Sequence, residues 1–304
     1  MEQQLFQHVN RPEWGLAMVA SEQPTRRVYQ FEDGQARVIA QAYWKLMKPV
    51  EDAEQLQRAV RRLRLLVKGT DVAMKSSPVA SEGNLEDQLS IVKEVWPEGF
   101  ANPTYTHRYR SGKSKLKSQI EPVLALVEEQ WNLDALPDPE TPATAKKVVD
   151  ALAHVLGKSD LLSATERKAL DGLSGKAVAT VAQGFLAMLG ADIDRRFTVW
   201  LETLQDAGLA PSWGLVTAPV ALSAPEQHVA VRPSVFKRQA KILMPTLKIS
   251  SEATLESYDA MLGMSLRIFR DLKNANLAPK DLFDVRNFIF LTLRTDAARK
   301  LADL

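Results

Sequence analysis

The sequence contains no cysteine and only four histidines in 304 residues. The absence of cysteine excludes disulfides, thiolate nucleophiles, and zinc or iron–sulfur sites that depend on cysteine ligands. No two histidines have the spacing of metal ligands on one helix, so we expect no metal site, no cofactor and no catalytic histidine. The four are His8, His107, His154 and His228.

Long apolar segments are also missing. No stretch approaches the roughly 18 consecutive apolar residues that a membrane-spanning helix requires. The first thirty residues also lack the apolar core of a secretory signal. These absences predict a cytoplasmic protein that does not bind a membrane.

Motifs of nucleotide-binding and hydrolytic enzymes are absent as well. Gly-Lys-Ser occurs at 112–114 and at 157–159, but a phosphate loop also needs a glycine five residues earlier and a buried strand before it. Asp138, Glu140 and Lys146 have the residue types of a metal-dependent nuclease, but they lie in a proline-rich segment instead of a hairpin. The sequence therefore predicts no enzyme and no catalytic residue.

Charge is nearly balanced, with 39 Lys and Arg against 37 Asp and Glu and a formal net charge of +2. It is placed unevenly, because residues 1–120 carry a net charge of +4 and the remainder a net charge of −2. Excess positive charge favours phosphate-rich partners. The N-terminal part is therefore the side that we expect to face nucleic acid.

The clearest strand patterns lie in the first 50 residues. Residues 16–20 form a short apolar run, and in 28–32 the side chains alternate with the period of a half-buried strand. Asp33-Gly34 favours a hairpin into 37–40, and 11–15 contains the proline and glycine of a turn. The pattern predicts a small, strongly bent antiparallel sheet or barrel.

The phrase His8-Val9-Asn10-Arg11-Pro12-Glu13-Trp14-Gly15-Leu16 resembles the start of a small bacterial domain of unknown function. That domain is similar to the Tudor-like, RNA-polymerase-interacting domain of CarD proteins, and related modules lie at the end of UvrD-type helicases. The resemblance covers roughly the first 50 residues and implies an SH3/Tudor-like barrel that docks onto protein or nucleic acid, commonly the transcription machinery. This sequence departs from the family at Val9 and Ala17, where the family often has proline and glycine. The matching positions are Pro12, Trp14, Gly15, Val19, Phe31 and Glu32.

Two interpretations stay open for the aromatic and basic residues of this module. Trp14 is either the hydrophobic plug of a barrel too small to have another core or part of a binding surface. Arg26, Arg27 and Arg37 are either a binding face or ordinary solvated positions on strands.

The region 51–118 is predicted to begin with a basic amphipathic helix. From Glu51 onward, apolar residues recur every three or four positions, and arginine or lysine fills much of the remaining surface. This helix either packs against its neighbour and leaves its basic face solvated, or contacts phosphate with that face. Its candidate phosphate ligands are Arg61, Arg62, Arg64 and Lys68.

Residues 105–117 contain five positive charges, two tyrosines and no negative charge. Basic residues interleaved with aromatics suit a single strand or a phosphate backbone. An ordinary helix start with solvated lysines has the same composition, and both interpretations stay open. The candidate binding residues are Tyr105, Arg108, Tyr109, Arg110, Lys113, Lys115 and Lys117.

From residue 119 to 304 the pattern is helical. Thr141-Pro142 and the capping box Ser163-x-x-Glu166 mark helix starts, and residues 228–232 allow one short strand before a helix that begins at Pro233. Three segments of this part resemble uncharacterised bacterial proteins and add an expectation about fold only: 232–240, Tyr258 and 281–288.

We therefore expect an α+β protein with an SH3/Tudor-like β-barrel (1–50), a basic helix and linker region (51–118) and an α-helical domain (119–304). The favoured hypothesis is a non-enzymatic protein that docks onto nucleic acid, DNA in preference to RNA, or onto RNA polymerase or another protein subunit. The alternative is a scaffold subunit of a bacterial multi-protein assembly, such as an anti-phage defence complex, without direct nucleic-acid contact. An enzyme with scattered catalytic residues is the third hypothesis. In the barrel, the candidate binding residues are Arg11, Trp14, Arg26 and Arg27.

Overall fold

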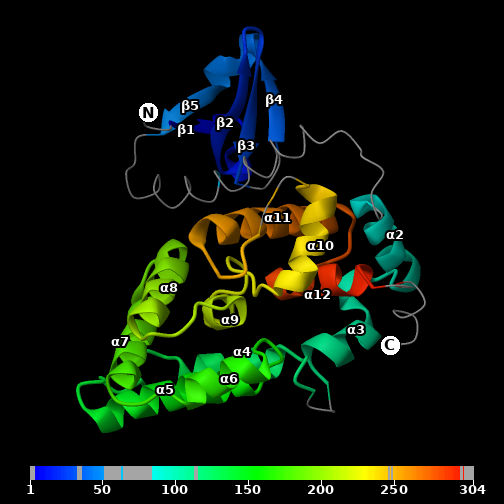
Figure 1. Ribbon diagram of the computed structural model, residues 1–304. Coiled ribbons are helices and arrows are strands. Elements are labelled where there is room, and N and C mark those ends of the chain that lie inside the picture. The colour runs from blue at the N-terminus through cyan, green and yellow to red at the C-terminus, as the bar shows by residue number, and fades with distance from the viewer. Residues whose placement is uncertain are drawn as a thin grey trace.

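The computed structural model describes residues 4–32, 36–50, 63, 84–112, 116–245, 247, 249–294 and 297. The protein is α+β: an N-terminal antiparallel sheet of five strands precedes a helical body (Figure 1). The predicted basic helix, with Arg61, Arg62, Arg64 and Lys68, lies outside the described residues, as do Lys113 and Lys115.

The sheet has the strand order β4-β3-β2-β1-β5, and all its pairs are antiparallel. A single 3-10 turn, Pro12–Trp14, lies between the first two strands, and another, Gln41–Leu46, precedes the last. Within the described residues β4 and β5 do not pair with each other, so the sheet is not closed into a barrel there. The three predicted strands are confirmed as β2 Leu16–Gln23, β3 Arg26–Phe31 and β4 Ala36–Ala40. Two further strands, β1 Leu5–His8 and β5 Met47–Val50, complete the sheet and were not predicted.

Each face of the sheet has its own small apolar cluster, because successive side chains on a strand point to opposite faces. One face buries Tyr29 and Phe31, with Trp14 packed beside them. The other face buries Leu5 and Met18 against Leu63. The sheet thus has a core that is separate from the core of the helical body.

Most helices of the body follow an N-cap residue whose side chain accepts a hydrogen bond from a free backbone N–H group of the first turn. Ser163 forms the predicted capping box, and Thr141 is the predicted N-cap and also forms a capping box with Thr144. Pro233 occupies the first turn of its helix as predicted. The helices are α2 Leu85–Val95, α3 Pro103–Tyr105, α4 Glu121–Gln130, α5 Pro142–Gly157, α6 Ala164–Asp171, α7 Lys176–Gly190, α8 Arg196–Asp206, α9 Trp213–Ser223, α10 Pro233–Leu243, α11 Leu255–Asn274 and α12 Leu282–Thr292.

Helix α9 lies in the interior of the body, with α11 and α12 above it and α4 to α6 below it in Figure 1. All of its residues from Trp213 to Leu222 are buried. The prediction of a strand at 228–232 is wrong: this segment is irregular, and Val231 donates its backbone N–H to the Thr217 hydroxyl instead of to a strand.

A π-turn follows α3 directly. It spans Thr106–Arg110, and its wide turn is closed by the Ser111 N–H, which donates to the Thr106 carbonyl at 2.9 Å. Because this turn holds one residue more than an α-helical turn, it sets which of the neighbouring side chains face the core.

Among the described residues, no single helix is long and apolar enough to cross a membrane. Only α6 and α7 taken together reach that length and composition, and they meet at a bend of 109°.

Candidate functional site

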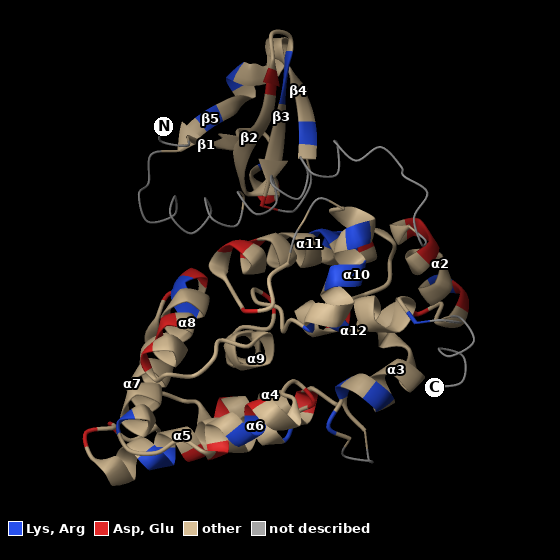
Figure 2. Cartoon of the chain, in the orientation of Figure 1, with Lys and Arg blue, Asp and Glu red and all other residues tan. Residues whose placement is uncertain are grey.

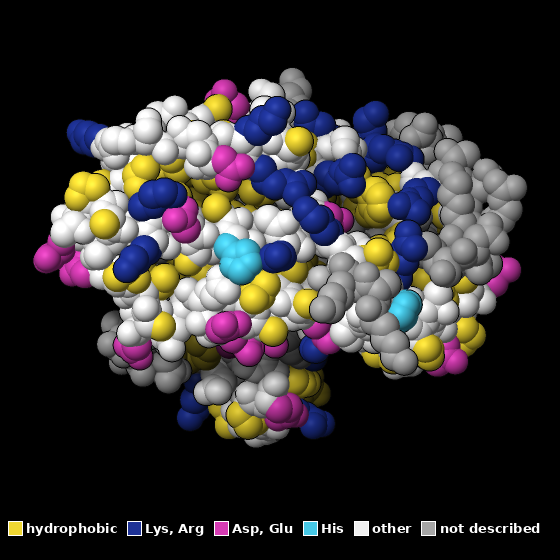
Figure 3. Space-filling view, turned by 90° about the horizontal axis from the view of Figure 1, so that it is seen from below, with side chains coloured by type: hydrophobic (Ala, Val, Ile, Leu, Met, Phe, Trp, Pro, Cys, Tyr) yellow, Lys and Arg dark blue, Asp and Glu magenta, His cyan; other side chains and the backbone are white. Residues whose placement is uncertain are grey.

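Basic side chains are unevenly distributed over the described residues. Figure 2 shows Lys and Arg on β4 and β5 and along α10, and the α10 sequence contains no acidic residue. On the face seen from below, Lys and Arg gather in a band where Asp and Glu are fewer (Figure 3). The sheet and the α10 region are therefore the two candidate binding regions among the described residues.

On the sheet, the half-buried ring of Trp14 lies among basic and aromatic groups. The Arg37 guanidinium carbon lies 4.1 Å from the ring centre and that of Arg11 6.0 Å away. The rings of His8 and Phe31 pack at centroid distances of 4.9 and 5.2 Å. The Trp14 ring thus belongs to the aromatic cluster and is also partly exposed at the surface, and a role in binding stays a prediction.

The turn before β2 positions this tryptophan. Pro12 starts the 3-10 turn that carries Trp14, and Gly15 follows with a φ of +72° and a ψ of −162°, a conformation that only glycine adopts readily. Glu32 then accepts the Leu16 N–H through its Oε2 atom at 2.8 Å. The residues that carried the resemblance therefore contact one another.

A second arginine–tryptophan pair lies on the same face. The Arg27 guanidinium carbon lies 4.0 Å from the centre of the Trp44 ring. Arg27 pairs with Ile39 across the strands and Tyr29 pairs with Arg37, so Arg27 and Arg37 share one face of the sheet.

The predicted arginines of the sheet also contact polar side chains that lie a few residues away in the sequence. Arg27 also donates two hydrogen bonds to Glu22, at 2.9 and 2.7 Å. Arg26 is exposed and donates to Gln23 at 2.7 Å, and Arg11 is exposed and pairs with Glu13 at 3.4 Å. The contacts of Arg11 and Arg26 are exposed and therefore weak, so these two side chains remain available to a ligand.

The structure corrects the prediction for Tyr105, Tyr109 and Arg110. All three side chains are buried in the helical body, with exposed fractions of 0%, 7% and 3%. A nucleic-acid strand cannot lie against side chains that are buried to this extent, so they do not form a nucleic-acid surface. Of the other residues predicted in this segment and described by the structure, Arg108 and Lys117 are exposed.

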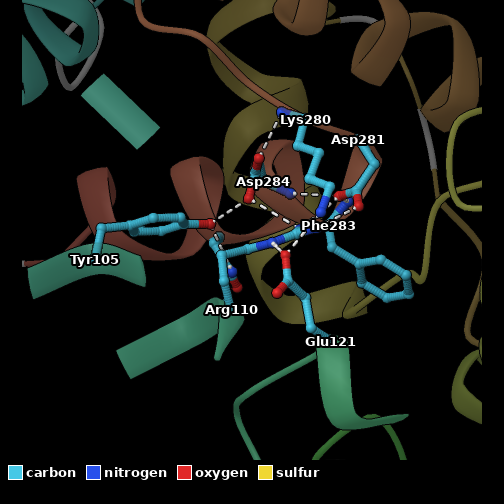
Figure 4. Close-up of polar contacts among 8 residues, drawn as sticks. Tyr105, Arg110, Glu121, Lys280, Asp281, Phe283 and Asp284 are labelled. Carbon is cyan, nitrogen blue, oxygen red and sulfur yellow. Dashed lines mark hydrogen bonds and ion pairs between the residues drawn. The ribbon is translucent and has the colours of Figure 1, made fainter. Parts of the chain in front are cut away.

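Arg110 is held by acidic residues at the start of α12 (Figure 4). Its Nη1 and Nη2 atoms donate to the two carboxylate oxygens of Asp281, both at 2.9 Å, and Nη1 also approaches Asp284 at 3.3 Å. Burial alone would lower the pKa of Arg110, but the hydrogen bond to Asp281 and the charge of Asp284 raise it. The guanidinium therefore stays charged.

Asp284 is the centre of the same network. Its Oδ1 atom accepts the Tyr105 hydroxyl at 2.5 Å, and its Oδ2 atom accepts the Lys280 N–H at 2.7 Å. Asn287 completes the network by donating to the Tyr105 oxygen at 3.1 Å. Burial raises the pKa of Asp284 and the Arg110 charge opposes that rise. We interpret the network, called here the Arg110 clamp, as a structural connection between the π-turn and α12.

A pocket lies beside the clamp, between the start of α10 and the middle of α12. It encloses about 380 Å³ of space, part of it open to solvent. The two phrases that resemble uncharacterised bacterial proteins, 232–240 and 281–288, supply much of its wall, a role that the sequence did not indicate. The lining residues are Tyr109, Asp160, Arg232, Val235, Phe236, Arg286, Asn287 and Phe290.

No group of three or more His, Asp or Glu side chains that could hold a metal ion occurs within the part of the chain that the structure describes. His228 is a buried core residue: its Nε2 atom lies 2.7 Å from the Ile193 carbonyl, and its Nδ1 atom lies 3.0 Å from the Tyr258 hydroxyl.

No protein-family model, curated protein or solved structure matches this chain. We therefore base the function on the residues described above.

Proposed function

We propose that this chain is a non-enzymatic cytoplasmic protein whose N-terminal sheet docks onto nucleic acid, DNA in preference to RNA, or onto a nucleic-acid machine such as RNA polymerase. The observation that carries the proposal is the pair of arginine–tryptophan stacks on one sheet face, Arg37 with Trp14 and Arg27 with Trp44. Guanidinium groups bind phosphate, and half-exposed tryptophan rings offer a surface on which bases stack. The helical body then holds a partner.

The proposal includes an SH3/Tudor-like barrel for the first 50 residues. Its support is the strand order, in which β1 to β4 form a meander and β5 returns to pair with β1 after a 3-10 turn. The mutual contacts of Trp14, Gly15, Phe31 and Glu32 give further support, because these residues carry the resemblance to the Tudor-like domain.

The test is binding of labelled single- and double-stranded DNA and RNA to the full chain at two salt concentrations. We expect binding that weakens with salt, each phosphate contact adding roughly 0.9 to the log–log slope on duplex DNA. The variant R27A/R37A should bind more weakly. K146A is the matched control, because Lys146 is an exposed cation paired with Asp150 on α5, away from the sheet. Absence of binding at low salt would overturn the proposal.

The scaffold alternative has one observation of its own in favour. Val38 on β4 and Tyr43 in the following turn are 60% and 58% exposed, and within the described residues β4 is an edge strand. Exposed apolar side chains beside a free strand edge suit a protein partner. In that case, crosslinking from position 43 in cells should capture a protein partner of the native chain, and the V38D variant should no longer capture it. Neither the native chain nor V38D should then bind DNA.

A further inference from the structure

The pocket between α10 and α12 contains more positive charge than its protein contacts balance. Arg232, the N-cap residue of α10, and Arg286 on α12 both line it. Arg294 lies close by, with its guanidinium carbon 4.2 Å from the centre of the Phe290 ring, and Arg232 lies 5.1 Å from the same centre. Asp160 is the only acidic residue in the pocket wall.

Arg286 is the least satisfied of these cations. Its side chain is only 13% exposed, yet its guanidinium makes just one ion pair within the described residues, to Asp160 at 3.6 Å, and no hydrogen bond. Burial lowers its pKa, the Asp160 charge raises it, and the Arg232 charge lowers it again. A buried guanidinium normally has close, hydrogen-bonded partners because burying an unpaired charge is costly.

We propose that this pocket binds the phosphate group of a small phosphorylated molecule, with Arg232 and Arg286 as its ligands. The Asn287 side chain lines the pocket and adds a polar group, and Val235, Phe236 and Phe290 form apolar walls for the body of the molecule. The pocket wall thus combines charged and polar groups, which can fix the orientation of a ligand, with apolar surface that can cover the rest of it. The site lies in the helical body and does not depend on the function proposed for the sheet.

Phosphate fits this charge better than carboxylate does. A phosphate monoester carries about −1.5 to −2 charges at pH 7 and three acceptor oxygens, whereas a carboxylate carries one charge and two oxygens. The two negative charges of a phosphate monoester balance the two positive charges of Arg232 and Arg286, which repel each other when no ligand is bound.

The experiment is titration calorimetry of the purified full chain with inorganic phosphate, glycerol 3-phosphate, adenosine monophosphate and acetate at constant ionic strength. We expect phosphate ligands to bind and acetate not to bind. Equal affinity for inorganic phosphate and the two monoesters would identify free phosphate as the ligand. Tighter binding of a monoester would show that the apolar walls contact the rest of the molecule.

Three variants separate a binding role from a structural one. R232A should weaken phosphate binding about tenfold or more, because a charge-assisted hydrogen bond is lost. D160N should tighten it about two- to fivefold, because a competing negative charge leaves the site. K237A is the control on the same helix, since Lys237 is exposed and does not line the pocket.

D160N also removes the ion pair of Arg286, so the stability of each variant is measured beside its binding. Arg232 and Asp160 are both exposed residues, and unchanged thermal unfolding of each variant is the check. R286K adds a third variant that keeps the charge and loses the planar set of donors. Failure of every phosphate ligand to bind the native chain would overturn the proposal. So would equal binding of acetate, or binding that R232A and D160N leave unchanged.

Discussion

Glu32 accepts the backbone N–H of Leu16 at 2.8 Å, directly after the glycine that turns the chain into β2. The same carboxylate fills the space beside Gly15, where an added Cβ atom would lie 2.8 Å from Oε2. The turn that presents Trp14 therefore depends on a contact between two strand ends.

The variant G15A should destabilise the sheet by about 2–3 kcal/mol, because the backbone conformation is unfavourable for alanine and the Cβ atom displaces Glu32. Hydrogen exchange of β1 to β3 amides measures the effect. G208A is a matched control: Gly208 has a φ of +73° but no atom within 4 Å of an added Cβ, so only about 1 kcal/mol of conformational cost is expected. Unchanged protection of the sheet in G15A would contradict the role of this turn.

Glu166 joins the starts of two helices. Its Oε2 atom accepts the Ser163 N–H at 2.7 Å, and its Oε1 atom accepts the Ser212 hydroxyl at 2.6 Å and the Gly214 N–H at 3.0 Å. The E166Q side chain keeps only one acceptor oxygen, so it cannot accept from the start of α6 and from the start of α9 at once. This variant should lower the free energy of unfolding by about 1–2 kcal/mol. Chemical denaturation measures this loss, with E202Q, an exposed position on α8, as the control.

The contribution of Glu166 should also depend on pH. Burial raises its pKa, but the hydrogen bonds from Ser212 and Ser163 outweigh burial, so the pKa lies below its ordinary value of 4.5. For an acid with a lowered pKa, the stabilisation is complete above the unfolded-state value and is lost as the pH falls through the folded-state value. The difference between native protein and E166Q should therefore be constant near neutrality and shrink below pH 4.5. If the difference in stability between the native protein and E166Q grew as the pH fell, the predicted direction of the pH dependence would be wrong.

The Arg110 clamp predicts that R110A is strongly destabilising. Removing the guanidinium leaves Asp281 and Asp284 buried without their counter-charge, which costs about 3–5 kcal/mol in comparable buried pairs. R108A, two residues earlier and exposed, should be neutral within about 0.5 kcal/mol. Thermal unfolding compares the two. Equal stabilities would show that the clamp does not connect the π-turn to α12.

Helices α7 and α8 approach closely at Gly184. A Cβ atom there would lie 2.0 Å from the Thr203 Oγ1 atom, so G184A must separate the helices and should cost about 1–3 kcal/mol. Gly157, at the end of α5, has no atom within 4 Å of an added Cβ, and G157A should be neutral or slightly stabilising. Opposite signs for the two variants in chemical denaturation are the expected result.

Features that depend on neighbouring residues could be predicted from the sequence. The helix start at Thr141 follows from an N-cap residue and a proline directly after it, and the start at Ser163 follows from a cap and a partner three residues later. The β3–β4 hairpin follows from strand alternation, although its turn lies outside the described residues. Helix α9 is apolar on every side and contains Pro219, so its sequence has no helical periodicity from which its bounds could be predicted.

Features that depend on distant residues could not be predicted. Arg110 pairs with Asp281, which lies 171 positions away in the sequence. The sequence around Arg110 alone is typical of a charged surface segment. The pocket likewise combines Arg232 and Arg286 from separate helices, each unremarkable alone. Residue composition shows which charges are present, but tertiary packing decides which of them are buried.

The π-turn at Thr106–Arg110 makes the Arg110 clamp depend on chain length as well as on residue identity. Deleting one residue from this turn would restore α-helical pitch and rotate the following side chains by about 100°. Arg110 would then point away from Asp281 even though every residue of the clamp were retained. A related chain with a one-residue gap here would therefore lack the clamp. The length of this turn, more than the identity of any one of its residues, would then distinguish related chains that have the clamp from those that do not.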